Sequence, residues 1–275
     1  MSVELISLLF ILAAFSLYGV LSGVELGVAV LRIEPRLAPA AISKKVFTPR
    51  LEMTNVLLAL GCAGMALLFK DAAAKVFEAA WPALLVGILA LIVRAGLLVY
   101  LVMHKTRTGD RALNYIFAAV SFVVPVSLGS AGIYMVTGAP FWGSSVGFTL
   151  FITLLVGLAA LGAGFMYYIG GKQAPQGVVV VSRVLNLALA CLLAIVLLGV
   201  LSGGGSHLFN LSYAYLAIIA AGIIMMQSIF LAAGKEWRMW WCLAGLAVLA
   251  PFLVGLANYP YLIFPDVMVA AARAI

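Results

Sequence analysis

Charged residues are scarce in this sequence of 275 residues. They make up 9% of the chain, whereas a soluble globular domain contains about 25%. Hydrophobic residues make up 66%, and the mean hydropathy is +1.22. This composition excludes an ordinary water-soluble domain and indicates a chain that is solvated largely by lipid.

Cysteine and histidine are also rare. Cys62, Cys191 and Cys242 lie within hydrophobic runs, and none of them belongs to a CxxC or CxxCH motif. The sequence therefore offers no support for a disulfide framework, a zinc site or covalently attached haem. His104 and His207 fall on opposite sides of the predicted membrane, so they cannot ligate one haem iron together. We expect this chain to bind no metal and no haem.

Hydrophobic runs of about 20 residues, the length that spans a bilayer core, recur along the chain. Each must be helical, since a segment in lipid has to satisfy its own backbone hydrogen bonds. The sequence predicts an all-α polytopic membrane bundle of about eight transmembrane helices, forming one transmembrane domain over residues 1–275. The predicted helices lie near residues 5–32, 51–70, 79–104, 112–136, 145–171, 178–201, 209–233 and 237–258.

The net charge of +7 is distributed unevenly between the two sides of this bundle. By the positive-inside rule the crowded side is cytoplasmic, and an even number of helices then leaves both termini outside. The orientation of the protein in the cell membrane, where it contacts lipids, thus explains the positive charge. We do not expect the chain to bind nucleic acid. The cytoplasmic residues are Arg32, Arg36, Lys44, Lys45, Arg50, Lys105, Arg107, Arg111, Lys172, Arg183, Lys235 and Arg238, and the outer ones are Lys70, Lys75 and Arg273.

One acidic residue, Glu25, lies inside the first predicted helix. It is about 10 Å below the cytoplasmic surface, at roughly 1.5 Å per residue. Ser22 shares its face of the helix. Gly19, Gly23 and Gly27 form a small-residue stripe on the opposite face, which suits close helix packing. Since neither a carboxylate nor a packing stripe favours lipid, we expect this helix to be surrounded by protein.

Two further ionisable residues belong to the same half of the bundle. Arg94 lies in the third predicted helix at a depth similar to that of Glu25, within reach of an ion pair, and Glu52 begins the second helix at the cytoplasmic side. A charged group inside a bilayer costs at least a few kcal/mol, so those that are retained usually have a role. Two interpretations stay open: a proton-conducting or ion-binding cluster, and a structural salt bridge that fixes the first three helices.

Six short motifs follow one another in the order and at the approximate spacing of one family. They are Ser22-Gly23-Val24-Glu25-Leu26-Gly27-Val28, Pro49-Arg50-Leu51-Glu52, Arg94, Ser121-Phe122-Val123-Val124-Pro125, Gly138-Ala139-Pro140-Phe141 and Tyr259-Pro260-Tyr261-Leu262-Ile263-Phe264-Pro265. In these motifs the chain resembles subunit II of the cytochrome bd quinol oxidases, from the first helix to about residue 266. The family's second acid in helix 1 corresponds to Glu25, its first acid is replaced by Ser22, and its helix 2 acid corresponds to Glu52.

The chain also departs from that family. Leu51, Met53 and Leu57 replace aromatic and polar residues around the helix 2 acid. The outer loop between the sixth and seventh predicted helices is short, and the family's usual ninth helix does not follow Pro265. We therefore expect a divergent, shortened member of this family, and what takes the place of the ninth helix stays open.

The resemblance implies a haem-free subunit of a bd-type quinol:oxygen oxidoreductase in the respiratory chain. In that family the partner, subunit I, binds two b-type haems and one d-type haem, oxidises quinol and reduces oxygen to water. Subunit II packs against it and helps to deliver protons from the cytoplasm. Glu25, Glu52 and Ser22 would then line the proton pathway, with Arg94 as the counter-charge that keeps Glu25 ionised. Whether a structural quinone or lipid lies in this subunit stays open.

Two other functions also stay open. One is a proton-coupled secondary transporter that uses Glu25 as its coupling site, although the broken helices and matched repeats of transporters are not evident. The other is a quinone-interacting membrane anchor subunit of another respiratory complex, which shares the topology but not the six motifs.

Overall fold

The structure is a computed structural model. It describes residues 3–31, 51–103, 111–137, 140–143, 145–171, 174–199, 222–223, 226, 230, 236–258, 261–263 and 267–268. The helix predicted near 209–233 lies almost entirely outside these residues, as do His104 and His207.

Seven α-helices occupy most of the described residues. They are α1 (Val3–Leu31), α3 (Leu51–Leu68), α4 (Lys70–Met103), α5 (Arg111–Thr137), α6 (Ser145–Gly170), α7 (Gln176–Gly199) and α9 (Glu236–Asn258). A short 3-10 helix, η1 (Phe141–Gly143), precedes α6, and a two-stranded antiparallel hairpin of β1 (Tyr261–Ile263) and β2 (Val267–Met268) follows α9. The hairpin is the one departure from an all-helical fold within the described residues.

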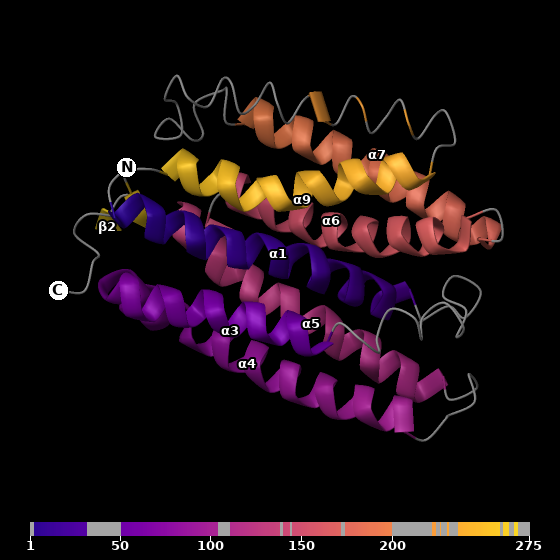
Figure 1. Cartoon of the computed structure of the whole chain (residues 1–275), viewed down its shortest axis with the longest axis horizontal. Helices are drawn as coiled ribbons and strands as arrows, with labels where there is room; N and C mark the ends of the chain where they lie inside the picture. The colour runs from indigo at the N-terminus through magenta and orange to yellow at the C-terminus, as the bar shows by residue number, and fades with distance from the viewer. Residues whose placement is uncertain are drawn as a thin grey trace.

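The helices lie roughly side by side along one direction, with α1 in the middle of the bundle (Figure 1). Helix α1 contacts α6 and α9 on one side and α3 and α5 on the other. The beginning of α1 and the β1–β2 hairpin lie at the same end of the bundle (Figure 1). This arrangement places α1 where it has protein neighbours on several faces.

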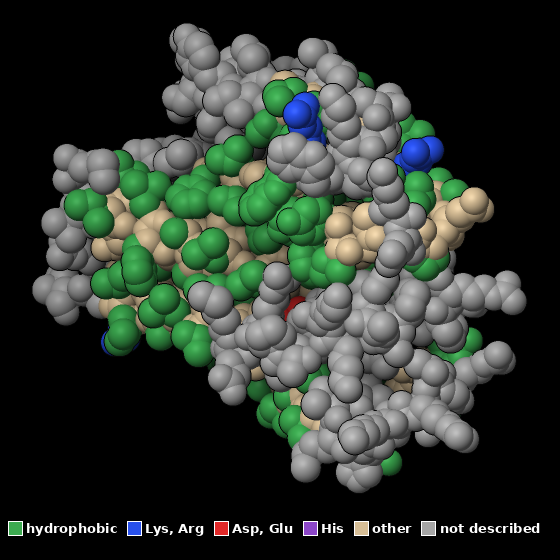
Figure 2. All heavy atoms as spheres, turned by 45° about the vertical axis from the view of Figure 1, so that its right-hand side comes forward, with side chains coloured by type: hydrophobic (Ala, Val, Ile, Leu, Met, Phe, Trp, Pro, Cys, Tyr) green, Lys and Arg blue, Asp and Glu red, His purple; other side chains and the backbone are tan. Residues whose placement is uncertain are grey.

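The outer faces of the bundle are apolar. Ile88 and Ile92 on α4 are 52% and 63% exposed, and Figure 2 shows hydrophobic side chains over most of the described surface on one face. Five helices in the described residues are long and apolar enough to cross a membrane, and the helices at Thr54–Leu68 and Arg238–Leu249 are shorter but also apolar. Exposed aliphatic surface of this extent is matched to lipid, and the chain is a multi-pass membrane protein.

Helix α4 begins at Lys70, whereas the hydrophobic pattern predicts its start near residue 79. The first turns carry the charged residues Lys70, Asp71 and Lys75, but they also contain a run of alanines, the best helix formers. Asp71 lies in the first turn, where the helix dipole stabilises a carboxylate. Phe69 alone separates α3 from α4, and its N–H still donates to the Met65 carbonyl at 2.9 Å. Charge therefore lowered the hydropathy of this segment without interrupting its helix.

Helices α1 and α6 approach each other closely at two glycines. A Cβ at Gly27 would lie 2.7 Å from the Gly162 Cα and would also meet the backbone carbonyl of Leu158. A Cβ at Gly23 would lie 2.7 Å from a Leu161 methyl, whereas one at Gly19 would have no atom within 4 Å. The close contact is thus concentrated at the Gly27–Gly162 level, where backbone meets backbone.

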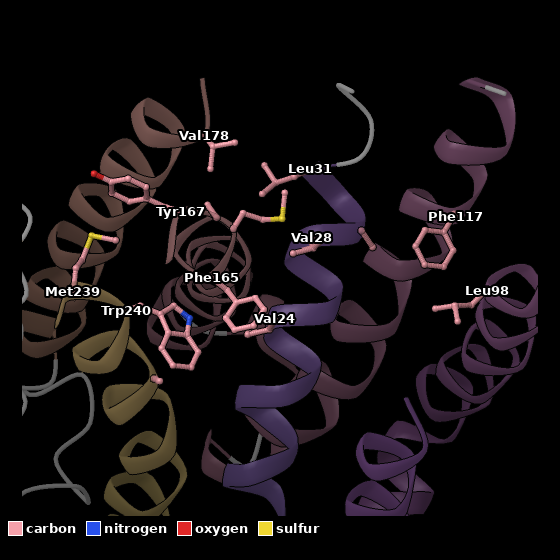
Figure 3. Packing of buried hydrophobic residues seen from close by; sticks show 14 residues of the cluster. Val24, Val28, Leu31, Leu98, Phe117, Phe165, Tyr167, Val178, Met239 and Trp240 are labelled. Atoms are coloured by element: carbon pink, nitrogen blue, oxygen red, sulfur yellow. The ribbon is translucent and has the colours of Figure 1, made fainter. Parts of the chain in front are cut away.

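The main buried cluster surrounds this contact. Val24 and Val28 of α1 pack with Phe165 and Met166 of α6, and the cluster extends to Trp240 of α9 (Figure 3). Because α1 supplies residues to this cluster as well as to the polar site on its other side, a shift of α1 would disturb both.

We predict that Gly27→Ala destabilises the protein by about 2 kcal/mol or more, because both obstructing groups are backbone and cannot rotate away. Gly19→Ala is the matched control, since its new methyl group meets open space. Thermal unfolding of the purified protein in detergent measures both. Equal melting temperatures for the two variants would contradict the close α1–α6 contact.

Candidate proton site between helices α1, α3 and α4

A carboxylate and a guanidinium group meet inside the bundle. Arg94 Nη2 on α4 donates to Glu25 Oε2 on α1 at 3.0 Å. The Glu25 side chain is 0% exposed and that of Arg94 is 3% exposed. Ion pairs that are this deeply buried interact strongly because few water dipoles screen them, but each charge also loses its hydration.

Helix α3 supplies a second donor to the same carboxylate. Thr54 Oγ1 donates to Glu25 Oε1 at 3.0 Å, and Thr54 is 2% exposed. Each carboxylate oxygen thus accepts one hydrogen bond, from two different helices. Hydrogen bonds to a charged group are stronger than neutral ones, so this set joins α1, α3 and α4 at one level of the bundle.

One aromatic ring lies beside the cation, and a tyrosine lies near both charges. The Arg94 Cζ lies 6.0 Å from the centroid of the Phe117 ring on α5, and Phe117 is fully buried. A cation at this distance from a ring face is attracted by the ring quadrupole. Tyr18, two turns before Glu25 on α1, lies within electrostatic range of both Arg94 and Glu25. The charges therefore lie among aromatic and hydroxyl groups from three helices, α1, α3 and α5.

The other candidate residues lie at different distances from the Glu25–Arg94 pair. Ser22 is buried on α1, one turn from Glu25, and it interacts with Tyr18. Glu52 belongs to the first turn of α3, two residues before Thr54, and its side chain lies outside the described residues. Gly23 and Gly27 face α6, on the side of α1 away from the ion pair, and Gly19 lies in open space.

Three neighbours of the Glu25–Arg94 pair were not predicted from the sequence. Thr54 and Phe117 look like ordinary helix residues in a hydrophobic run, and Tyr18 has the same ambiguity. A helical spacing of seven residues between Tyr18 and Glu25, with Ser22 between them, was the available signal for a polar face on α1. No comparable pattern singles out Thr54, because its role depends on which helix packs against α1.

The described residues hold no group of three or more His, Cys, Asp or Glu side chains that could bind a metal ion. Cys62 and Cys191 are exposed free thiols, and Cys242 is a partly exposed one. The site itself consists of a carboxylate beside a fixed cation, with Glu25 Oε2 3.0 Å from Arg94 Nη2. Such a group can accept and release a proton, and the hydroxyls of Thr54 and Ser22 can both donate and accept hydrogen bonds.

Comparison with known proteins agrees with this architecture. The model of the family described as "Cytochrome bd terminal oxidase subunit II" matches residues 3–274. A chain of the bd oxidase from Geobacillus thermodenitrificans has a TM-score of 0.80 and 15% sequence identity, and the alignment covers 100% of this chain and 90% of that one. At this identity the likeness shows a shared fold. No curated protein sequence matches the chain significantly.

We predict strong coupling between Glu25 and Arg94 in a double-mutant cycle. Arg94→Met leaves a buried carboxylate without its cation and should destabilise the protein by about 3–5 kcal/mol. The double variant Glu25→Met/Arg94→Met removes both charges and should be more stable than Arg94→Met alone. Unfolding of the purified protein in detergent measures the cycle.

The exposed Arg183 on α7 provides the control, since Arg183→Met removes a cation that is not buried. It should change the stability little. Strict additivity of the Glu25 and Arg94 substitutions would contradict a direct, energetically important pair.

Proposed function

The chain belongs to the cytochrome bd terminal oxidase subunit II family, and on that premise we propose that it is the haem-free subunit of a bd-type quinol:oxygen oxidoreductase. It packs against a haem-bearing subunit I, which holds the b-type and d-type haems and reacts with the quinol pool and oxygen. It takes part in respiratory electron transport through that partner and lies in the cytoplasmic membrane.

The proposal includes a topology. Residues 1–275 form one transmembrane domain that crosses the bilayer about eight times, with the segment near 209–233 as one of the crossings. Both termini are outside and the basic loops are cytoplasmic. Seven apolar helices in the described residues support this arrangement. The common position of the beginning of α1 and of the β1–β2 hairpin at one end of the bundle also supports it (Figure 1).

We further propose that Glu25 carries protons between the cytoplasm and the partner subunit. The observation on which this proposal rests is a fully buried carboxylate whose two oxygens accept hydrogen bonds from Thr54 and Arg94. It lies six residues before the end of α1 at Leu31, about 9 Å along the helix, so the proposed proton route to it from the cytoplasmic side is short.

The remaining candidates then have distinct parts in this pathway. Glu52, in the first turn of α3, provides an acid near the cytoplasmic entrance. Ser22 extends the polar face of α1 outward from Glu25 toward Tyr18. Arg94, whose Nη2 lies 3.0 Å from Glu25 Oε2, supplies the counter-charge beside the carboxylate.

A purely structural salt bridge is the competing interpretation, and the Glu25→Gln substitution separates the two. Glutamine preserves the size of the side chain and one carbonyl acceptor, but it cannot take up a proton. We predict that Glu25→Gln lowers the oxygen consumption and proton uptake of the purified complex by roughly 100-fold, as expected when a proton-transfer group is removed.

The control is Glu78→Gln, which removes an exposed acid from α4, and it should retain full turnover. The optical spectrum of each preparation reports whether the haem-bearing partner is assembled. Normal turnover of Glu25→Gln at normal haem content would eliminate the proton-carrying role and leave the structural one.

A further inference from the structure

Two buried polar atoms near the ion pair have no hydrogen-bond partner among the described residues. They are Arg94 Nε on α4 and Ser121 Oγ on α5. Arg94 is 2% exposed and Ser121 is 0% exposed. Buried polar groups in native proteins nearly always have a partner, either protein or ordered water. A partner for each of these two atoms is therefore to be expected.

The packing of α4 against α5 places the two residues at the same level. A Cβ at Gly87 on α4 would lie 3.0 Å from the Ser127 Cβ and 3.5 Å from a Leu128 methyl, both on α5. Arg94 follows Gly87 by seven residues, and Ser121 precedes Leu128 by seven, which is about two helical turns in each case. Antiparallel helices that touch at the first pair therefore bring the second pair to face each other.

Contacts between α4 and α5 one helical turn beyond Arg94 and Ser121 give the same alignment of the two helices. Leu98, four residues after Arg94, and Phe117, four residues before Ser121, belong to one buried cluster (Figure 3). Between the two levels, the Arg94 Cζ is 6.0 Å from the Phe117 ring. Arg94 and Ser121 are thus enclosed between apolar contacts above and below.

Neither atom forms a hydrogen bond within its own helix. A serine in a helix can donate to the carbonyl four residues earlier, but the Ser121 hydroxyl has no such bond. The guanidinium group uses Nη2 for Glu25, whose other oxygen accepts from Thr54. The unused Nε–H is a donor, and the hydroxyl can both donate and accept. A single group that bridges the two atoms would therefore accept from Nε–H and either donate to or accept from the hydroxyl.

We propose that one internal water molecule bridges Arg94 Nε and Ser121 Oγ. Water fits because it accepts from Nε–H and either donates to or accepts from the hydroxyl, as buried waters do in polar sites. A small anion fits less well, since Glu25 already neutralises Arg94. Ser121 is then a positioning residue: through the water it holds the guanidinium group in the orientation that pairs with Glu25.

This inference goes beyond the proposed function and does not depend on it. A bound water would hold Arg94 whether or not Glu25 carries protons. It extends the polar site to α5, so that α1, α3, α4 and α5 all contribute a hydrogen-bonding group at one level of the bundle.

Electron cryo-microscopy of the purified complex tests the proposal, at a resolution where ordered waters are visible elsewhere in the bundle. We expect density within about 2.7–3.2 Å of both Arg94 Nε and Ser121 Oγ. In Ser121→Ala this density should disappear and the guanidinium group should move away from Glu25. In the control Ser127→Ala, at another buried serine of α5, both features should stay as in the unchanged protein.

Three results would overturn the proposal. The first is an empty space at this position in the unchanged complex. The second is a Ser121 hydroxyl that donates to the Phe117 carbonyl, and the third is a water that persists in Ser121→Ala. If Ser121→Ala does not assemble, the map of the unchanged complex decides the question alone.

Discussion

The structure depends on the need to compensate one buried charge. Glu25 is fully buried in the middle of the bundle, where an unpaired carboxylate would be strongly unfavourable. Arg94 and Thr54 meet that need from two other helices. Because the two donors are on α4 and α3, the pairing is satisfied in one arrangement of α1, α3 and α4. Phe117 on α5 lies against the cation and completes the enclosure.

The opposite side of α1 is held by a different kind of contact. At Gly27 and Gly162 the backbones of α1 and α6 come so close that neither position has room for a side chain. Lipid tails are as apolar as leucine, so close packing and hydrogen bonds are what distinguish helix contacts from lipid contacts in a membrane. Helix α1 has the hydrogen bonds on one face and the close packing on the other. This division explains why it occupies the middle of the bundle (Figure 1).

The positions of most helices and the depths of their charged residues can be predicted from the sequence. The residues that contact one another across helices mostly cannot. Hydrophobic runs locate the helices because the bilayer fixes their length, and counting residues from the helix ends places Glu25 and Arg94 at a similar depth. The start of α4 at Lys70 was missed because hydropathy treats Lys70 and Asp71 as loop residues. Thr54 and Phe117 could not be identified, nor could Gly19 be separated from Gly27, because those distinctions depend on which helices pack together and in what register.

The central claim is that the buried carboxylate of Glu25 exchanges protons while it is held by Arg94 and Thr54. Infrared difference spectroscopy of the purified complex between its oxidised and reduced states observes that exchange directly, through the carbonyl stretch of a protonated carboxyl group. The account predicts a carboxyl band that changes on reduction, shifts when the solvent is replaced by heavy water, and is absent from Glu25→Gln. A difference spectrum with identical carboxyl bands in the unchanged protein and Glu25→Gln would contradict it.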